Sequence, residues 1–225
     1  MDHLVQFTRN QNIEGITIKP LEEPGRSPFL IVDVAAKAGS TVQNLDQTVL
    51  MYGHMDKQPF GEGWDTDPCD PVIKDGIMYG RGSNDDGYSL FCAILSIKAC
   101  QTLGRGHPRI VITIEGSEEG EIHDLIFYMQ KHKEELGNPD LVVCLDSIAN
   151  NTETLFVTST LRGCINFDVK VQTGKNNMHS GHSGAFPQPF YVINQLLGRV
   201  IDLNTQELLP DFQPQIPDYC IEQTH

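Results

Sequence analysis

Apolar residues between positions 48 and 145 follow two patterns that alternate along the chain. Short, continuously apolar runs are typical of buried strands, and apolar residues repeated every three or four positions are typical of helices. The two helical patterns stop at Gly104 and Gly137, as helices commonly do. In chain order, the predicted elements are strand Thr48–Tyr52, helix Ser89–Leu103, strand Arg109–Glu115, helix Glu121–Leu136 and strand Leu141–Leu145. This order predicts a parallel sheet covered by helices on both faces.

Two further strands are predicted before this alternation. They are Gly15–Lys19 and Phe29–Ala35, and a loop containing Pro24, Gly25 and Pro28 separates them. The fold class that we expect is therefore α/β, with a mostly parallel sheet flanked by helices.

The pattern changes after about residue 158. Arg162–Thr173 alternates apolar and polar residues, which is typical of a half-exposed antiparallel strand. A loop rich in glycine and histidine then leads to a predicted helix, Pro189–Leu203. We place a domain boundary at Ser159–Leu161, so the expected domains are residues 1–160 and 161–225. The polar tail Leu208–His225 resembles an unfinished fold, and we expect the second domain to be partial.

Charge and composition argue against several classes of partner and location. The formal net charge is −14, whereas nucleic acids and acidic membranes bind basic faces. No apolar run approaches the roughly 20 residues that span a bilayer, and the first ten residues lack the pattern of a secretory signal. The six cysteines are scattered without a CxxC pair, and several lie in apolar runs. This usage is typical of free thiols, so we expect a reducing compartment, the cytoplasm.

Residues just beyond the predicted strands can share one site, because open parallel sheets bind ligands at the carboxyl ends of their strands. His54 and Asp56 follow the first of the three alternating strands, and their side chains point the same way along an extended chain. His54 can bind a metal through one ring nitrogen while Asp56 holds the other ring N–H. Taken alone, the His-x-Asp pair is more typical of an ordinary histidine in a loop than of a metal ligand.

The glycine-rich segment before the next helix contains two adjacent aspartates, Asp85 and Asp86. Either can cap that helix, since aspartate is favoured at helix N-termini. The glycines also suggest a phosphate-binding loop, but no Gly-Lys-Ser/Thr follows them and paired carboxylates repel phosphate. A cation ligand fits this segment better.

Carboxylates also follow the two later strands. Glu118, Glu119 and Glu121 come after the second, and Asp146 comes after the third. The plain interpretations are an acidic first helical turn, stabilised by the helix dipole, and the start of a turn. The functional interpretation is that one glutamate binds metal and its neighbour is a general base. Together with His54, these groups predict a site for zinc, manganese or a related divalent ion, and a carboxylate-rich set suits two ions.

The ordered motifs extend over roughly residues 49–203. They are Gly53-His54-Met55-Asp56, Gly63-Trp64, Asp67-Pro68, Asp75-Gly76, Tyr79 through Asp86, Glu118-Glu119-Gly120, Asp146, Leu161-Arg162-Gly163 and His179-Ser180-Gly181 followed by Gly184. In this order they resemble the two-zinc exopeptidases, which include carnosine dipeptidases, aminoacylases, glutamate carboxypeptidase and acetylornithine deacetylase. The resemblance implies a catalytic zinc-hydrolase domain in residues 1–160 and the start of an inserted α+β lid and dimerisation domain in residues 161–225.

The resemblance also implies a cofactor and its ligands. The family binds two zinc ions, for which manganese or cobalt can substitute. Matched position by position, His54 and Asp146 bind the first zinc, Asp85 bridges both ions and Glu119 binds the second zinc.

Three residues receive catalytic roles from the same resemblance. Asp56 orients His54, and Glu118 is the general base that activates the water. His179 reaches the active site of the partner subunit in a homodimer and stabilises the oxyanion. His182 is the competing choice, but the spacing to Gly184 favours His179, and a solvated loop histidine is the plain alternative for both.

The sequence departs from the family pattern at two points. Gly87 stands after the aspartate pair, where the family usually has lysine. The family's last histidine ligand of the second zinc comes from a later return to the catalytic domain, and the sequence printed here stops at His225 before such a segment. We therefore expect a truncated chain, or one that another polypeptide completes.

Three functions remain open at this point. The first is zinc-dependent hydrolysis of a dipeptide or an N-acyl amino acid. The second is a structural or assembly subunit without catalysis, suggested by the missing ligand. The third, a two-metal phosphoesterase, shares the ligand types, but the order of the motifs and their glycines disfavour it.

Overall fold

The chain forms two compact units, Met1–Val157 and Thr158–His225. The computed structural model describes residues 1–42, 44–120, 122–147, 151, 153–158 and 160–222. The predicted boundary included Ser159, which lies outside the described residues. The assignment of the two parts as a catalytic domain and a partial lid domain stays a prediction.

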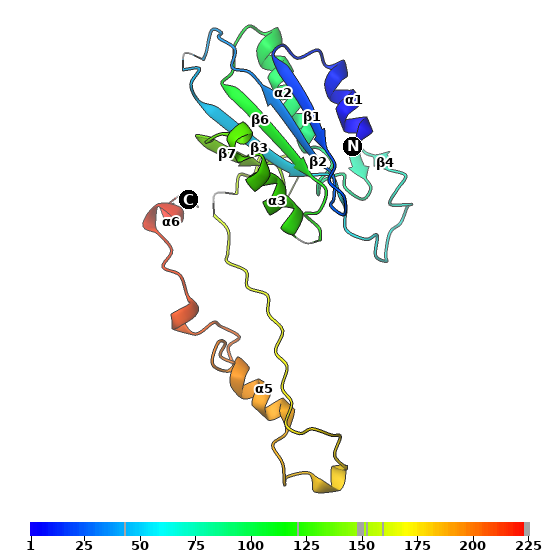
Figure 1. Cartoon of the computed structure of the whole chain (residues 1–225), viewed down its shortest axis with the longest axis vertical. Helices are drawn as coiled ribbons and strands as arrows, with labels where there is room; N and C mark the ends of the chain where they lie inside the picture. Colours follow the sequence, from blue (N-terminus) through cyan, green and yellow to red (C-terminus); the bar gives the residue numbers. More distant parts are fainter. Residues whose placement is uncertain (43, 121, 148–150, 152, 159, 223–225) are drawn as a thin grey trace. The chain divides into compact units, whose positions relative to one another are not determined.

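A five-stranded sheet forms the centre of the first unit (Figure 1). Its strands are β1 (Ile16–Leu21), β2 (Phe29–Val34), β3 (Thr48–His54), β6 (Arg109–Glu115) and β7 (Leu141–Cys144). They lie in the order β1–β2–β6–β3–β7. β3 pairs in parallel with β6 and β7, whereas β2 pairs antiparallel with β1 and β6. The predicted α/β class and the parallel arrangement of the three alternating strands are confirmed, and β1 and β2 make the sheet a mixed one.

The central strands contribute side chains to two separate hydrophobic cores, one on each face of the sheet. Leu30 and Val32 of β2 pack with Ile112 of β6 on one face, and Phe29 and Ile31 pack on the other. Because strand side chains alternate between faces, burial on both faces requires an apolar residue at nearly every position. This requirement explains the continuously apolar runs in the sequence.

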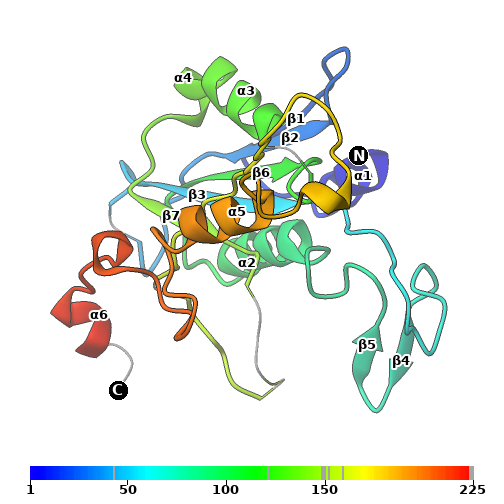
Figure 2. The same cartoon turned by 90° about the horizontal axis from the view of Figure 1, so that it is seen from below.

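Helices cover both faces of the sheet, as predicted (Figure 2). α1 (Asp2–Asn10) and α2 (Ser89–Thr102) pack on one face, and α3 (His123–Lys131) and α4 (Lys133–Leu136) pack on the other. The predicted helix Glu121–Leu136 is divided at His132, and Glu121 lies outside the described residues. α1 is an addition to the prediction, and its Val5 and Thr8 are buried.

A two-stranded hairpin, β4 (Val72–Lys74) and β5 (Ile77–Tyr79), precedes α2. Asp75 (φ 53°) and Gly76 (φ 80°) connect its strands. Positive φ at both turn residues matches the tight type I′ turn that Asp-Gly favours. The strands were not predicted, since three residues each are too few to show a periodic pattern.

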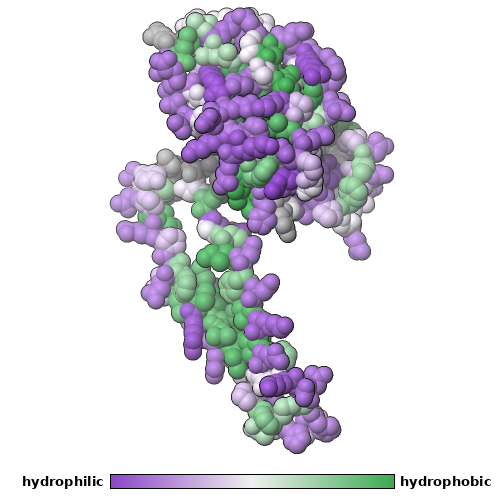
Figure 3. Space-filling model, in the orientation of Figure 1, coloured by the Kyte–Doolittle hydropathy of each residue, from purple (hydrophilic) through white to green (hydrophobic). Residues whose placement is uncertain are grey.

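In the second unit, the predicted strand Arg162–Thr173 is wrong. The described part of this unit contains α5 (Pro189–Leu197), α6 (Asp218–Glu222) and the short 3-10 helices η1 (Ser180–His182) and η2 (Pro210–Phe212). Residues 160–173 form no strand. A strand needs a hydrogen-bonded neighbour, and alternation supplies apolar side chains without supplying that partner. Ile165 is 82% exposed, and apolar surface is visible along this unit (Figure 3).

The predicted helix Pro189–Leu203 is shorter than expected, because α5 ends at Leu197 with Gly198 as its C-terminal cap. Within the described residues, no helix has the length and apolar character needed to cross a membrane.

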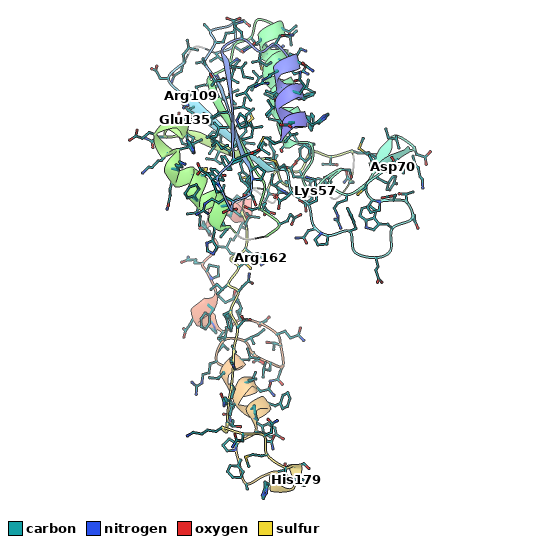
Figure 4. The ribbon with its side chains drawn as sticks, turned by 45° about the vertical axis from the view of Figure 1, so that its right-hand side comes forward. Lys57, Asp70, Arg109, Glu135, Arg162 and His179 are labelled. Carbon is teal, nitrogen blue, oxygen red and sulfur yellow. The ribbon has the colours of Figure 1, made fainter. Side chains whose placement is uncertain are left out.

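Arg109 connects the start of β6 to β2 and to the end of α4. Its guanidinium forms a two-point ion pair with Asp33 of β2. It also donates to the main-chain oxygens of Glu135 (2.7 Å) and Leu136 (3.3 Å) at the end of α4 (Figure 4). One planar group therefore joins the sheet to the helical layer, which a lysine ammonium cannot reproduce.

We expect Arg109→Lys to lower the free energy of unfolding by about 1–2 kcal/mol, because charge-assisted hydrogen bonds to a half-buried group are lost. Urea unfolding followed by circular dichroism measures the change. Arg9→Lys, on the exposed part of α1, is the matched control. Equal unfolding free energies for Arg109→Lys and the wild type would contradict this role.

Candidate metal centre

The predicted site residues of the first unit gather at one edge of the sheet. His54 is the last residue of β3, Glu118 and Glu119 follow the end of β6, and Asp146 follows the end of β7. Since β3 lies between its parallel neighbours β6 and β7, their carboxyl ends meet there. The strand order thus explains why residues 92 positions apart in the sequence come together.

The imidazole of His54 is the centre of this group. Its residue is only 2% exposed. Nε2 lies 3.0 Å from Asp85 Oδ1, 3.9 Å from Asp146 Oδ2 and 4.0 Å from Glu118 Oε2. Two ligands on a tetrahedral zinc ion, each about 2.0–2.2 Å from it, lie about 3.3–3.6 Å from one another. The three distances from His54 Nε2, which run from 3.0 to 4.0 Å, lie on either side of this range.

The other ring nitrogen of His54 faces Asp56. Nδ1 lies 3.1 Å from the main-chain oxygen of Asp56 and 3.4 Å from its Oδ1. A proton on Nδ1 is therefore held by Asp56, which leaves the lone pair of Nε2 for a metal. The Asp56 carboxylate also accepts the main-chain N–H groups of Glu118 (3.2 Å) and Glu119 (2.9 Å). One side chain thus positions groups from β3 and from the loop after β6.

The two aspartates of the glycine-rich segment have different environments. Asp86 is fully buried and accepts the main-chain N–H groups of His54 (2.9 Å), Tyr88 (3.2 Å) and Ser89 (3.2 Å). The helix-capping interpretation therefore applies to Asp86. Asp85 instead faces the imidazole of His54, as expected for a metal ligand.

The electrostatics of the group suit a cation. Burial raises the pKa of Glu118 and of Asp146, and their carboxylate neighbours raise it further, while His54 opposes the rise. Burial lowers the pKa of His54, but Asp146, Asp85 and other carboxylates outweigh it and raise the pKa overall. Carboxylates that repel one another in a half-buried site are stabilised by a bound positive ion.

Two sets of three residues place one donor atom each within 4.8 Å of one another. The first set is His54, Asp85 and Asp146, and the second is His54, Glu118 and Glu119. All four predicted metal ligands therefore belong to these sets, with His54 common to both.

Comparison with known proteins finds a family match within the first unit. Residues 50–154 match the model of peptidase family M20/M25/M40. This chain carries an M20-family peptidase domain. The Cys-Gly metallodipeptidase DUG1 of Saccharomyces cerevisiae is 32% identical over 195 residues, covering 84% of this chain and 40% of the relative. The human Beta-Ala-His dipeptidase is 31% identical over 174 residues, covering 75% of this chain and 34% of the relative.

Solved structures agree on the fold. Human carnosine dipeptidase 1 has a TM-score of 0.56 at 20% identity, covering 97% of this chain and 48% of that chain. The M20 metallo-carboxypeptidase Sso-CP2 from Sulfolobus solfataricus has a TM-score of 0.63 at 15% identity, covering 99% and 53%. The chain thus spans between a third and two fifths of the length of these curated relatives and about half of these structures.

The donor atoms of the M20 domain fit a divalent metal. Glu119 Oε2 accepts a hydrogen bond from Gln58 (2.6 Å). Glu119 Oε1 is buried and has no hydrogen-bond partner among the described residues. A buried carboxylate oxygen without a donor is costly unless a cation binds it. Imidazole and carboxylate donors without thiolate are typical of zinc and manganese sites.

His179 belongs to the other compact unit, where its exposed side chain accepts the N–H of Gly181 (3.0 Å) at the start of η1. Its predicted role stays a prediction. Glu121, the third carboxylate of the acidic segment, lies outside the described residues.

Sequence reasoning missed a polar network beside Glu118. Tyr52 donates a hydrogen bond to the buried side chain of Glu115, which also accepts one from Ser117 Oγ (3.1 Å). Burial raises the pKa of both Tyr52 and Glu115. The alternation of side chains along a strand is the signal that could have found Tyr52, because it places Tyr52 on the same face of β3 as His54.

We expect Asp56→Ala to weaken zinc binding by about 10–100-fold, because removing a group that orients a metal-binding histidine typically has an effect of this size. Competition with a chromogenic chelator measures the dissociation constant. Asp70→Ala removes an exposed carboxylate near β4 and is the control. An affinity within twofold of wild type would show that Asp56 does not orient the site.

Proposed function

We propose that the protein containing this chain is a zinc-dependent hydrolase that cleaves the amide bond of dipeptides or N-acyl amino acids. The observation that carries the proposal is the convergence of His54, Asp85, Glu119 and Asp146 at one edge of the sheet. The printed names of the relatives, a Cys-Gly metallodipeptidase and a Beta-Ala-His dipeptidase, support small peptides as the substrate class.

Two zinc ions are the cofactor in this proposal. His54 and Asp146 would hold the first, Glu119 the second, and Asp85 would lie between them. Zinc bound there would act as a Lewis acid that polarises the scissile carbonyl and makes water a stronger nucleophile at neutral pH. The alternative divalent ions, manganese and cobalt, accept the same donors.

Glu118 is the proposed general base. Its side chain lies 4.0 Å from His54 Nε2 and is 37% exposed, so it reaches both the donor cluster and solvent. The N–H of the same residue is held by Asp56. A glutamate with a raised pKa can take a proton from the attacking water and return it to the leaving amine.

The substrate has room beside this base. A cavity of about 410 Å³ borders Glu118 and is lined in part by Tyr52, Ile122 and Leu125. Its volume is within the range of small-molecule sites. Glu115 and His123 also line the cavity, so polar and apolar groups share its walls, which suits a small peptide.

We expect Glu118→Gln to retain its zinc and to lose at least about 100-fold in turnover, because the amide cannot accept the proton. Zinc content is measured by mass spectrometry, and hydrolysis is measured with Cys-Gly and β-Ala-His dipeptides. Glu134→Gln, on an exposed position of α4, is the control. Full turnover in Glu118→Gln would refute the base assignment. Zinc binding by the wild type without hydrolysis would favour an assembly role instead, and hydrolysis of phosphate esters would favour the phosphoesterase.

The proposal extends to a homodimer in the cytoplasm, formed through residues 161–225. In it, His179 of each subunit stabilises the oxyanion in the partner's site. We expect His179→Ala to lower turnover about 100-fold or more while zinc content and dimerisation stay unchanged, since one oxyanion donor is lost. Sedimentation and peptide hydrolysis measure these properties. Normal turnover in His179→Ala would leave His182 to be tested in the same way.

A further inference from the structure

The ammonium group of Lys57 lies where two metal-binding segments meet. Nζ donates hydrogen bonds to the main-chain oxygens of Met55 (3.0 Å), Asp56 (3.1 Å) and Asp86. An ammonium has three N–H donors, so these carbonyls use all of them. Figure 4 labels Lys57 at the junction between the sheet and the segment that leads to the β4–β5 hairpin.

The three carbonyls belong to different parts of the site. Met55 and Asp56 directly follow His54, and Asp86 directly follows Asp85. The main-chain oxygen of Asp56 contacts both Lys57 Nζ and His54 Nδ1, each at 3.1 Å. Lys57 therefore joins the segment that presents the imidazole to the loop that presents the facing carboxylate.

Two glycines make room for this arrangement. A Cβ atom on Gly82, whose φ is +78°, would lie 2.2 Å from Cε of Lys57. A Cβ on Gly87 would lie 2.1 Å from the main-chain oxygen of Gly82. Position 87, directly after the aspartate pair, has no space for a side chain in this backbone, and the cation reaches the loop from position 57.

We propose that Lys57 is a positioning residue of the metal centre, which holds the His54 segment and the Asp85 loop at the separation required by a shared divalent cation. The proposal deepens the proposed function and rests on its metal site. In this proposal, the three hydrogen bonds of Lys57 set the distance of 3.0 Å between His54 Nε2 and Asp85 Oδ1.

Charge and geometry predict opposite effects of removing this lysine. Loss of a positive charge beside a cation site, by itself, strengthens binding of a divalent ion by simple electrostatics. Loss of the three hydrogen bonds lets the two segments separate and weakens binding. A weaker affinity after removal of the charge can therefore come only from lost positioning.

The test compares Lys57→Met, Lys57→Arg and wild type by zinc titration against a competing chelator. Lys57→Met keeps the aliphatic stem over Gly82, and Lys57→Arg keeps the charge on a planar group that cannot direct three donors to the same carbonyls. Lys74→Met, an exposed lysine of β4, is the control. The Co²⁺ absorption spectrum of each variant reports the geometry at the ion, and urea unfolding without metal reports the fold.

We expect Lys57→Met to bind zinc about tenfold or more weakly, with Lys57→Arg also weakened and Lys74→Met unchanged. The Co²⁺ spectrum should change in both Lys57 variants. Unchanged or tighter zinc binding by Lys57→Met would overturn the proposal, and if that variant does not fold, wild-type affinity and spectrum in Lys57→Arg would overturn it. Failure of the wild type to bind zinc would contradict the proposed function itself and is thus distinguishable.

Discussion

The rest of the site depends on the hydrogen bonds that the buried carboxylate of Asp86 accepts. It accepts the N–H of His54 at the end of β3 and the N–H groups of Tyr88 and Ser89 at the start of α2. Its residue is fully inaccessible to solvent, so an unpaired oxygen there would be costly. The contact is tight enough that Gly53 has no room for a side chain, since a Cβ would lie 2.2 Å from Ser89 Oγ. Together with the hydrogen bonds of Lys57, this link holds the loop bearing Asp85 in place beside His54.

The site is assembled mainly through main-chain contacts to charged side chains. Asp56 holds two N–H groups of the loop after β6, Asp86 holds three N–H groups around β3 and α2, and Lys57 holds three carbonyls between them. Such contacts fix the backbone beside each donor while leaving the side chains of His54 and Asp85 free to bind a metal. This division explains why neighbouring residues in Asp85-Asp86 have different roles although they are chemically identical.

The sequence was sufficient to predict the central strands of the first unit because β2 and β6 are buried on both faces. A run rich in isoleucine and valine, such as Arg109–Glu115, has few alternatives to a central strand, and glycines follow the helices on either side of it. The edge at which the site lies followed from the parallel order of β3, β6 and β7. The same information could not predict Arg162–Thr173, because alternation indicates a strand only when another backbone pairs with it. The short hairpin β4–β5 was missed, since its three-residue strands are largely exposed.

The candidate metal ligands and Asp56 were predictable because their chemistry and position coincide, whereas the contacts of Lys57 and the burial of Glu115 were not. Lys57 resembles any surface lysine in the sequence, and only the structure places its ammonium against Asp86. Glu115 is the last residue of a predicted strand, and its burial beside Tyr52 depends on packing between β3 and β6.

The central claim is that His54, Asp85 and Asp146 share a divalent metal. Anomalous diffraction at the zinc absorption edge, from crystals of the protein grown with zinc, tests it most directly. The account predicts an anomalous peak about 2.0–2.2 Å from His54 Nε2 and from carboxylate oxygens of Asp85 and Asp146. A structure at saturating zinc with no peak at this edge of the sheet, or with zinc bound only elsewhere, would contradict it.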